Sequence, residues 1–517
     1  MQSFRLDQRN RLQETPRRAS GACAACHARR IRCDVGAAKP ICSFCQRDGR
    51  VCEQRPRKQR RTRGHEQTAQ SESSISSYGS QQKDTSASQR DVSASVEHGH
   101  IERAMFMGPE VLRAQDGQQP DYTSHVTGDS DVNRQICDLQ QAYALPSRSI
   151  QLALFENFWE NCYPWDPIVE RFQVVDVPSA NVSPLLLQAI FLGGSRVSAA
   201  SLPSVSPEDF YRRAKTLFWT DQERDPLTKV IAASLLHWYN PHGPELVSTN
   251  TSTFWNRIAI GLAMQLGVHS AQKRFPDEGL RRRIWWMLVA RDCLISAAHG
   301  RPQAINLDHC DVPRPTLHDF PLGSTVAPVF VAYVDLAVIV GKFVNYSIRR
   351  APVEAQITDT AQRLLRWVGD LPPMLRLHAR QVSQAGSHTS LIEPFNIQRL
   401  SITYYAAVSM LYRARTSDDP FPTAAAIAGS TIASIFEDFL ARDLVHRLSP
   451  VYTFYLLVAS VALLSCYGYK ELWRNAEEDL RVISLAQEEM KKRWGSAKGS
   501  IRSFEKMYAV TVSHPSW

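Results

Sequence analysis

The sequence predicts a mainly α-helical protein in three parts: a small cysteine-rich N-terminal module, a disordered linker and a large all-helical domain. Three observations carry this prediction. Six cysteines near the N-terminus follow one repeated spacing, the stretch after them is rich in Ser, Gln and Asp, and the remaining chain has apolar residues at helical intervals. We place the three parts at residues 1–65, 66–148 and 149–517.

The cysteine segment consists of two equal halves. Each half reads C-x2-C-x6-C, and adding 19 to the positions of the first half gives those of the second. This repeat is typical of a metal core with approximate two-fold symmetry, because cysteines in an ordinary hydrophobic core have no reason to keep register. The predicted metal ligands are Cys23, Cys26, Cys33, Cys42, Cys45 and Cys52.

The number of ligands indicates two zinc ions. Structural zinc takes four thiolate or imidazole ligands in a tetrahedron, so six thiolates can serve two ions only if two sulfurs bridge. The pseudo-symmetry assigns the bridges to Cys23 and Cys42, and both coordination spheres are then closed, as in structural zinc sites. A disulfide framework would need a secreted chain, and the charged N-terminus has no apolar core for a signal peptide.

The positive charge of the chain is concentrated around these cysteines. Residues 1–63 carry 17 Arg or Lys against 5 Asp or Glu, a net charge of +12, so the other 454 residues carry −3 of the total of +9. A localised basic patch indicates a polyanionic partner. The basic run 55–63 suits a phosphate-binding arm, a nuclear localisation signal, or both.

These residues resemble the DNA-binding domain of the fungal zinc binuclear cluster transcription factors. The resemblance rests on the cysteine pattern, on Lys39-Pro40 before the fourth cysteine and on the basic residues between the second and third cysteines. It implies binding in the DNA major groove, with the end of a helix reading a CGG-like triplet. The chain departs from the family at His27, where Arg or Lys is usual.

The resemblance also implies residue roles. Arg29 and Arg30 match the basic pair that reads guanine, while the arm after the cysteines would contact phosphate only. The predicted DNA-binding residues are Arg29, Arg30, Arg32, Arg57, Lys58, Arg60 and Arg61. The implied function is a nuclear, zinc-dependent, sequence-specific regulator of RNA polymerase II genes, whose partners are double-stranded DNA and the transcription machinery.

The segment 66–148 cannot bury enough apolar surface to fold alone, because it is Ser/Gln-rich and has no leucine between its start and Leu112. A short ordered piece is expected near residues 101–112. Coiled-coil dimerisation needs apolar a and d positions over three or more heptads, and the segment lacks them. We therefore expect any homodimer to form through the helical domain.

From residue 149 onward the apolar spacing predicts helices throughout. One helix should span 255–267 with Gly267 as its C-terminal cap, and a second should begin near Pro276 and end near Gly300. The uncharged stretch 450–469 is as long as a membrane span, but its Thr, Ser and Tyr content favours a buried core helix, so no membrane contact is predicted. Residues 150–320 weakly resemble the middle homology region of the same fungal regulators, the cutinase transcription factor-like subgroup in particular.

No catalytic residues are predicted, and the chain is not expected to be an enzyme. The basic run 281–283 is interpreted as a solvated helix start. Asp292, which stands beside Arg291, is interpreted as a member of an intradomain ion pair or as a cap. The histidines have no metal-ligand spacing. Two alternatives remain: a zinc-bound interaction module of the ubiquitin-ligase kind, which needs eight ligand positions, and an enzyme that the zinc segment targets to DNA. Interhelical clefts favour small-molecule pockets, but the sequence does not locate one.

Overall fold

The computed structural model describes residues 23, 26, 33, 40–49, 51–52, 130–199, 206–348, 350, 352–377, 393–413 and 423–513. They belong to two units, one within residues 1–88 that holds the cysteine segment and one within residues 89–517. Residues 53–129, with most of the predicted linker and the ordered piece expected near 101–112, lie outside the described residues.

Helices make up the regular structure of both units, and the described residues contain no β-strand. The cysteine unit contains α2 (Ser43–Arg47), and the larger unit contains the remaining elements. The first half of the larger unit comprises α4 (Ser130–Leu139), α5 (Arg148–Asn161), α6 (Arg171–Val174), η3 (Ser179–Asn181), α7 (Pro184–Arg196), α8 (Pro207–Trp219), α9 (Pro226–Leu235), η4 (Leu236–Trp238), α10 (Ser252–Leu266), α11 (Glu278–His299), η5 (Leu307–His309) and η6 (Leu317–Asp319). The second half comprises α12 (Ala327–Ser347), α13 (Glu354–Asp370), η7 (Pro373–Leu375), α14 (Pro394–Arg413), α15 (Thr423–Ala441), η9 (Val445–Arg447), α16 (Val451–Leu464), α17 (Lys470–Lys491) and α18 (Gly495–Ser513).

Three helices of the first half begin with the same local signal. Ser183, Ser206 and Asp225 each accept a backbone N–H from the first turn of α7, α8 and α9, and a proline follows each of them. The cap satisfies a donor that has no partner within the helix, and proline has no N–H to lose at this position. These starts are therefore fixed by the sequence itself.

The two helices predicted in detail are confirmed. Helix α10 ends at Leu266, and Gly267 follows in the left-handed conformation with φ 79°. Helix α11 begins after Asp277, whose carboxylate accepts the backbone N–H of Leu280 at 2.7 Å. It ends at Gly300, where φ is 60°, a conformation that favours glycine because a Cβ would clash there.

In the described part of the larger unit, helical structure begins at Ser130, before the boundary expected at residue 149. Helix α4 packs against α8, and the fully buried Cys137 contacts the Thr220 hydroxyl at 3.3 Å. The helix is only 10 residues long, so its apolar spacing is too short to stand out in a polar surrounding sequence. The helix is stabilised by packing against the rest of the larger unit, and such packing cannot be inferred from the local amino-acid composition.

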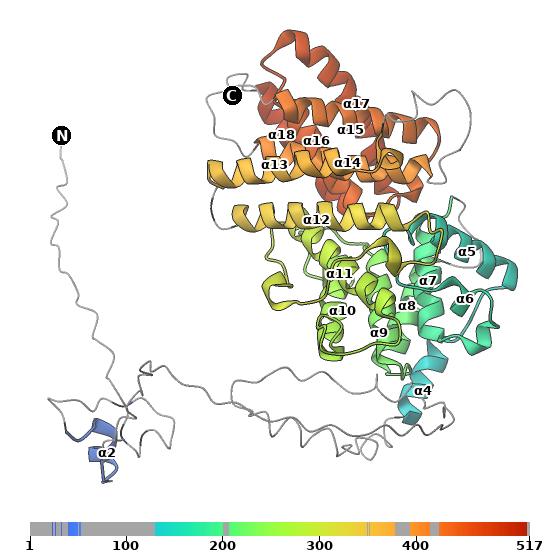
Figure 1. Ribbon diagram of the computed structural model, residues 1–517, viewed down its shortest axis with the longest axis vertical. Helices are drawn as coiled ribbons and strands as arrows, with labels where there is room; N and C mark the ends of the chain where they lie inside the picture. Colours follow the sequence, from blue (N-terminus) through green and yellow to red (C-terminus); the bar gives the residue numbers. More distant parts are fainter. Residues whose placement is uncertain are drawn as a thin grey trace, which may run out of the picture. The chain divides into compact units, whose positions relative to one another are not determined.

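Helix α12 organises the larger unit. It lies between α5–α11 on one side and α13–α18 on the other (Figure 1), and it packs against α11, α13 and α14. Helix α16 is surrounded by α14, α15, α17 and α18. One continuous apolar core runs through both halves.

Two helices of the described part, α12 and α15, are long and apolar enough to cross a membrane by length and composition alone. Within their most apolar windows, 61% and 44% of the residues are buried inside the protein. The uncharged stretch 450–469 contributes the 14-residue helix α16, which is shorter than a span and mostly buried. All three helices pack as core elements of the larger unit.

Candidate metal centre and buried charged cluster

The structure describes all six predicted metal ligands and brings four of them together. Cys23, Cys26, Cys42 and Cys45 are buried, and their sulfur atoms all lie within 4.8 Å of one another. Two further cysteines of the segment, at positions 33 and 52, are partly buried and pack against this group. No disulfide joins the described cysteines.

The backbone of each half holds one sulfur in the same way. The N–H of Cys26 donates to Cys23 Sγ at 3.4 Å, and the N–H of Cys45 donates to Cys42 Sγ at 3.4 Å. The second of these bonds caps α2, because Cys42 is the residue before its first turn. The repeated spacing of the sequence thus produces the same local geometry twice.

The third cysteine of each half is also placed symmetrically. Cys33 Sγ accepts the N–H of Cys23 at 3.5 Å, and Cys52 Sγ accepts the N–H of Cys42 at 3.3 Å. Both bonds span ten residues, and they are related by the same offset of 19. The two-fold symmetry inferred from the spacing is therefore present among the described atoms.

The distances between sulfur atoms suit tetrahedral zinc. A tetrahedron with zinc–sulfur bonds of about 2.3 Å has edges of about 3.8 Å. Cys23 Sγ lies 3.9 Å from Cys42 Sγ and 3.6 Å from Cys45 Sγ, and Cys26 Sγ lies 3.5 Å from Cys42 Sγ. Each of these contacts joins two sulfurs that the bridged arrangement assigns to the same ion.

The two cysteines assigned as bridges differ electrostatically from their neighbours. The backbone N–H of Cys45 lowers the pKa of Cys42 to about 6, and the N–H of Cys26 likewise lowers the pKa of Cys23. Burial raises the pKa of Cys26, and raises that of Cys45 to about 12. The N–H donors therefore favour thiolate at the two bridging positions, while the other two sulfurs must lose their protons to bind metal.

The residues predicted to contact DNA are a different case. They lie outside the described residues, so the structure neither supports nor contradicts their roles. They are Arg29, Arg30, Arg32, Arg57, Lys58, Arg60 and Arg61.

The interpretation of residues 281–283 as a solvated helix start is wrong for two of the three arginines. Arg281 and Arg283 are buried, at 3% and 1% exposure. Arg283 is ion-paired with Glu170 and donates to a backbone carbonyl of the same loop at 2.7 Å. Arg282 is partly exposed and pairs with Asp319. The three arginines therefore hold the start of α11 against neighbouring loops through ion pairs and hydrogen bonds.

Asp292 bonds to the loop that follows α11 and does not cap a helix in the described part of the chain, because Asn306 is the N-cap of η5, the next element. Its carboxylate accepts the backbone N–H groups of Ala304 and Ile305 at 2.7 and 3.0 Å. Arg291 instead pairs with Asp166, at the end of the turn after α5. Asp292 forms no ion pair within the described residues, and Arg291 reaches a different partner because adjacent residues on a helix point in different directions.

Asp166 is the centre of a buried charged cluster that the sequence did not reveal. Its carboxylate pairs with Arg291 and accepts hydrogen bonds from His237 Nε2 at 3.0 Å and Trp238 Nε1 at 2.9 Å. Arg291 also donates to the carbonyl oxygen of Ser234 at 2.6 Å. The cluster joins the turn after α5, the η4 segment and α11.

The cluster fixes the charges of its members. Burial alone would raise the pKa of Asp166, but the Arg291 guanidinium and the donors around the carboxylate hold it at about 2. Burial, together with Arg291, lowers the pKa of His237 to about 4 in spite of Asp166. At neutral pH the cluster therefore contains one anion, one cation and a neutral imidazole.

Two segments of the chain match known protein families. Residues 21–62 match the fungal Zn(2)-Cys(6) binuclear cluster domain, a domain that binds two zinc ions, and residues 155–322 match the fungal specific transcription factor domain. The first match covers all six cysteines, and the second extends from α5 to the segment after η6.

The chain is similar along most of its length to named fungal regulators. It is 30% identical to the acetamidase regulatory protein of Aspergillus fumigatus, and the match covers 78% of this chain and 55% of the relative. It is also 30% identical to the acetamidase regulatory protein of Emericella nidulans, with 78% of this chain and 54% of the relative covered. It is 25% identical to cutinase transcription factor 1 alpha of Fusarium vanettenii over 96% of this chain and 65% of the relative. The chain thus spans little more than half the length of the two acetamidase regulatory proteins. No solved structure matches it.

Proposed function

We propose that the chain is a zinc-dependent, sequence-specific DNA-binding regulator of RNA polymerase II transcription, because two of its segments match domains of fungal transcription factors and its relatives are named as transcription regulators. The observation that carries the proposal is the two-fold arrangement of cysteine sulfurs, whose spacings of 3.5 to 3.9 Å suit closed tetrahedral zinc. A closed zinc sphere has no open position for substrate or water, so its role is to fold the DNA-binding segment. The relatives described above are named as regulators and transcription factors.

The six cysteines are the proposed metal ligands, and Cys23 and Cys42 are the proposed bridges. One ion would be held by Cys23, Cys26, Cys33 and Cys42, and the other by Cys42, Cys45, Cys52 and Cys23. The contacts of Cys23 with Cys45 and of Cys42 with Cys26 support this sharing, because each crosses from one half to the other. A segment of this size has too small a hydrophobic core to fold by itself, so the zinc ions would supply the cross-links that stabilise it.

Base recognition is proposed for Arg29 and Arg30, DNA contact for Arg32, and phosphate contact for the basic arm. A planar guanidinium can donate two hydrogen bonds to the O6 and N7 acceptors of guanine in the major groove. A CGG-like triplet offers such guanines. The arm, with Arg57, Lys58, Arg60 and Arg61, would neutralise phosphates without reading sequence.

The experiment compares Arg30→Ala with Arg60→Ala in the full chain, using fluorescence anisotropy on duplexes with and without a CGG triplet. Arg30→Ala should lose about 1–3 kcal/mol of discrimination at one guanine. Arg60→Ala should weaken binding to all duplexes alike and reduce the salt slope by about one unit. Both variants should keep two zinc ions by native mass spectrometry. A uniform loss of affinity for Arg30→Ala would contradict its role in base recognition, and failure of the parent chain to bind any duplex would contradict the function.

The remaining parts of the proposal concern organisation and location. Residues 1–65 would form the DNA-binding module, and the part of 66–148 that precedes α4 a disordered tether. The regulatory domain that contacts the transcription machinery would comprise residues 149–517 together with α4, which packs on it. The protein would act in the nucleus, to which the basic arm could direct it. A homodimer would form through the helical domain, so that tether reach sets the spacing of half-sites. Sedimentation of the full chain, and of a variant lacking residues 1–65, tests this: dimerisation should survive the truncation.

A further inference from the structure

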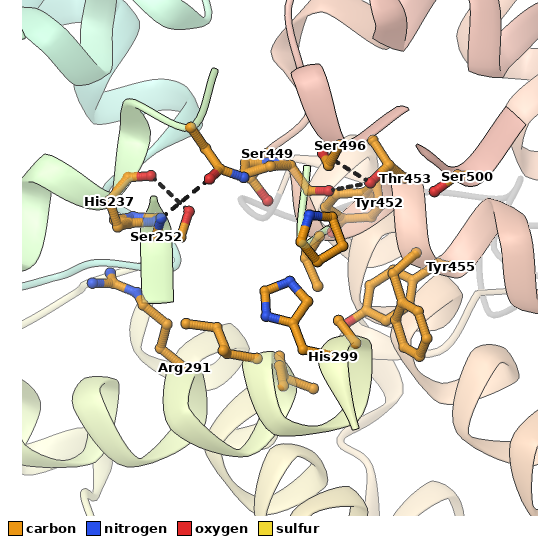
Figure 2. Close-up of a pocket in the computed structure, with 18 of the residues that line it drawn as sticks. His237, Ser252, Arg291, His299, Ser449, Tyr452, Thr453, Tyr455, Ser496 and Ser500 are labelled. Atoms are coloured by element: carbon orange, nitrogen blue, oxygen red, sulfur yellow. Dashed lines mark hydrogen bonds between the residues drawn. The ribbon is translucent and has the colours of Figure 1, made fainter. Parts of the chain in front are cut away.

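A pocket of about 400 Å³ lies in the helical domain where first-half elements meet α16 and α18. Its volume falls within the range of about 300–1,000 Å³ that is typical of small-molecule sites. Figure 2 shows side chains from widely separated parts of the chain facing one space, among them His237, His299, Tyr452 and Ser496. This pocket lies in the larger unit and is separate from the proposed metal centre.

One wall of the pocket is charged but electrically neutral as a whole. Asp166 and Arg291 line it and are paired with each other, and the remaining bonds of both groups run to His237, Trp238 and a backbone carbonyl. At the edge, Glu245 is paired with Arg502 at 2.7 Å. An anionic ligand would have to compete with Asp166 for Arg291. A cationic ligand would have to compete for the Asp166 carboxylate with the three groups that already donate hydrogen bonds to it.

Much of the remaining lining is apolar and aromatic. Trp165, Trp238 and Tyr333 come from the first half and α12, and Val451 and Tyr455 come from α16. A flat or cyclic apolar ligand would bury its surface against these rings. Aromatic side chains provide large contact areas, and they favour ring partners in stacked or edge-on arrangements.

Two hydrogen-bonding groups of the lining remain available to a ligand. Within the described part of the chain, the only hydrogen bond of the His299 ring joins Nδ1 to the Thr253 hydroxyl at 3.1 Å. Figure 2 shows this ring projecting into the pocket. Burial, and next the charge of Arg301, lowers the pKa of His299 to about 4, so the ring is neutral at pH 7. The Tyr455 hydroxyl is buried beside Thr403 without a hydrogen bond of normal geometry.

We propose that this pocket binds an uncharged, ring-containing small molecule with one or two polar groups, held between α11 on one side and α16 and α18 on the other. The internally paired charges favour a neutral ligand, the aromatic walls favour a ring, and the His299 ring supplies a hydrogen bond to a polar group. This inference goes beyond the proposed function, because it assigns a ligand site to the helical domain and does not depend on DNA binding.

The ligand class is tested with three probes that share one skeleton and differ in charge: 2-naphthylacetamide, 2-naphthylacetate and 2-(2-naphthyl)ethylamine. Equilibrium dialysis against the full zinc-loaded chain at pH 7 measures each affinity without DNA. The neutral amide should bind at least about tenfold more tightly than the anion and the cation, which corresponds to about 1.4 kcal/mol. Tighter binding of either charged probe, or no binding of the amide at about 1 mM, would overturn the proposal.

The location is tested with Ala298→Trp, which fills the pocket from α11. The matched control is Ala509→Trp, an exposed position on α18 beyond the pocket-lining residues. The first variant should lose amide binding at least tenfold, and the control should bind as the parent does. Equal binding by both variants would overturn the assignment of the site.

His299→Phe provides an independent variant in case the filled pocket disturbs folding. It keeps an aromatic ring of similar size but removes the ring nitrogens. With an unchanged circular dichroism spectrum, it should bind the amide several-fold more weakly while binding 2-methylnaphthalene, which has no polar group, as the parent does. Unchanged amide affinity would contradict the role of His299, and equal losses for both compounds would show that the ring nitrogen makes no specific bond.

Discussion

Replacing His237 by Gln should remove a measurable part of the acid sensitivity of the helical domain. The ring is buried, and burial together with Arg291 lowers its pKa from 6.5 to about 4. The unfolded chain therefore takes up a proton near pH 6.5, while the folded protein takes it up only near pH 4. The stability linked to this group is complete above about pH 6.5 and is lost as the pH falls toward 4. At about pH 5, these two pKa values correspond to a loss of about 2 kcal/mol from His237 alone.

Urea unfolding at about pH 7.5 and about pH 5, followed by tryptophan fluorescence, measures this loss. All 11 tryptophans lie at or after Trp159, so the signal reports the helical domain rather than the cysteine unit. The matched control is His318→Gln, at an exposed position. The control should lose as much stability on acidification as the parent, and His237→Gln should lose about 2 kcal/mol less. Equal losses in all three proteins would refute the argument that His237 is held neutral by its surroundings.

Three further predictions concern the charged cluster, the helix packing and the metal centre. Asp166→Asn should lower the free energy of unfolding at pH 7 by about 3–5 kcal/mol in urea titrations, because it leaves a buried arginine without its anion; a loss below 1 kcal/mol would contradict this. Gly194→Ala should lower the free energy of unfolding by about 3 kcal/mol in the same assay, since its Cβ would lie 2.1 Å from a backbone oxygen of α5. Gly261→Ala, whose Cβ would meet no neighbouring atom within 4 Å, should raise the free energy of unfolding by about 0.5–1 kcal/mol. Similar effects at both sites would rule out the close approach of α7 to α5. Native mass spectrometry should show both zinc ions lost or loosened in Cys23→Ser but only one in Cys26→Ser, and identical zinc contents would rule out the bridged arrangement.

The six cysteines predicted as metal ligands could be identified from the sequence because all of them lie within 30 consecutive residues. The spacing of such ligands has to meet the geometry of one small cluster, so it is visible along the chain. The same holds for the ends of α10 and α11, which depend on Asp277, Gly267 and Gly300 within one turn of each end. Features that are determined locally can be read locally.

The buried arginines of α11 were misread for the opposite reason. A run of three basic residues at a helix start usually faces water, because burying an unpaired charge is costly. The partner that makes burial of Arg283 acceptable is Glu170, 113 residues away. Asp166 and Arg291 are separated by 125 residues. No local pattern reports such pairings, and they become visible only when the fold brings the elements together.

The position of the pocket also indicates which of its walls can respond to a ligand. Helix α11 is tied to the first half by buried ion pairs through Arg283 and Arg291, so displacing it would separate charges in a low-dielectric interior. Helix α16 contains no charged residue and packs through apolar side chains, and the Arg502 pair of α18 is exposed to solvent, where ion pairs contribute little. Adjusting α16 and α18 therefore costs less than moving α11. A ligand held at His299 would act on the second half of the domain, while the first half, with its charged cluster, keeps its arrangement.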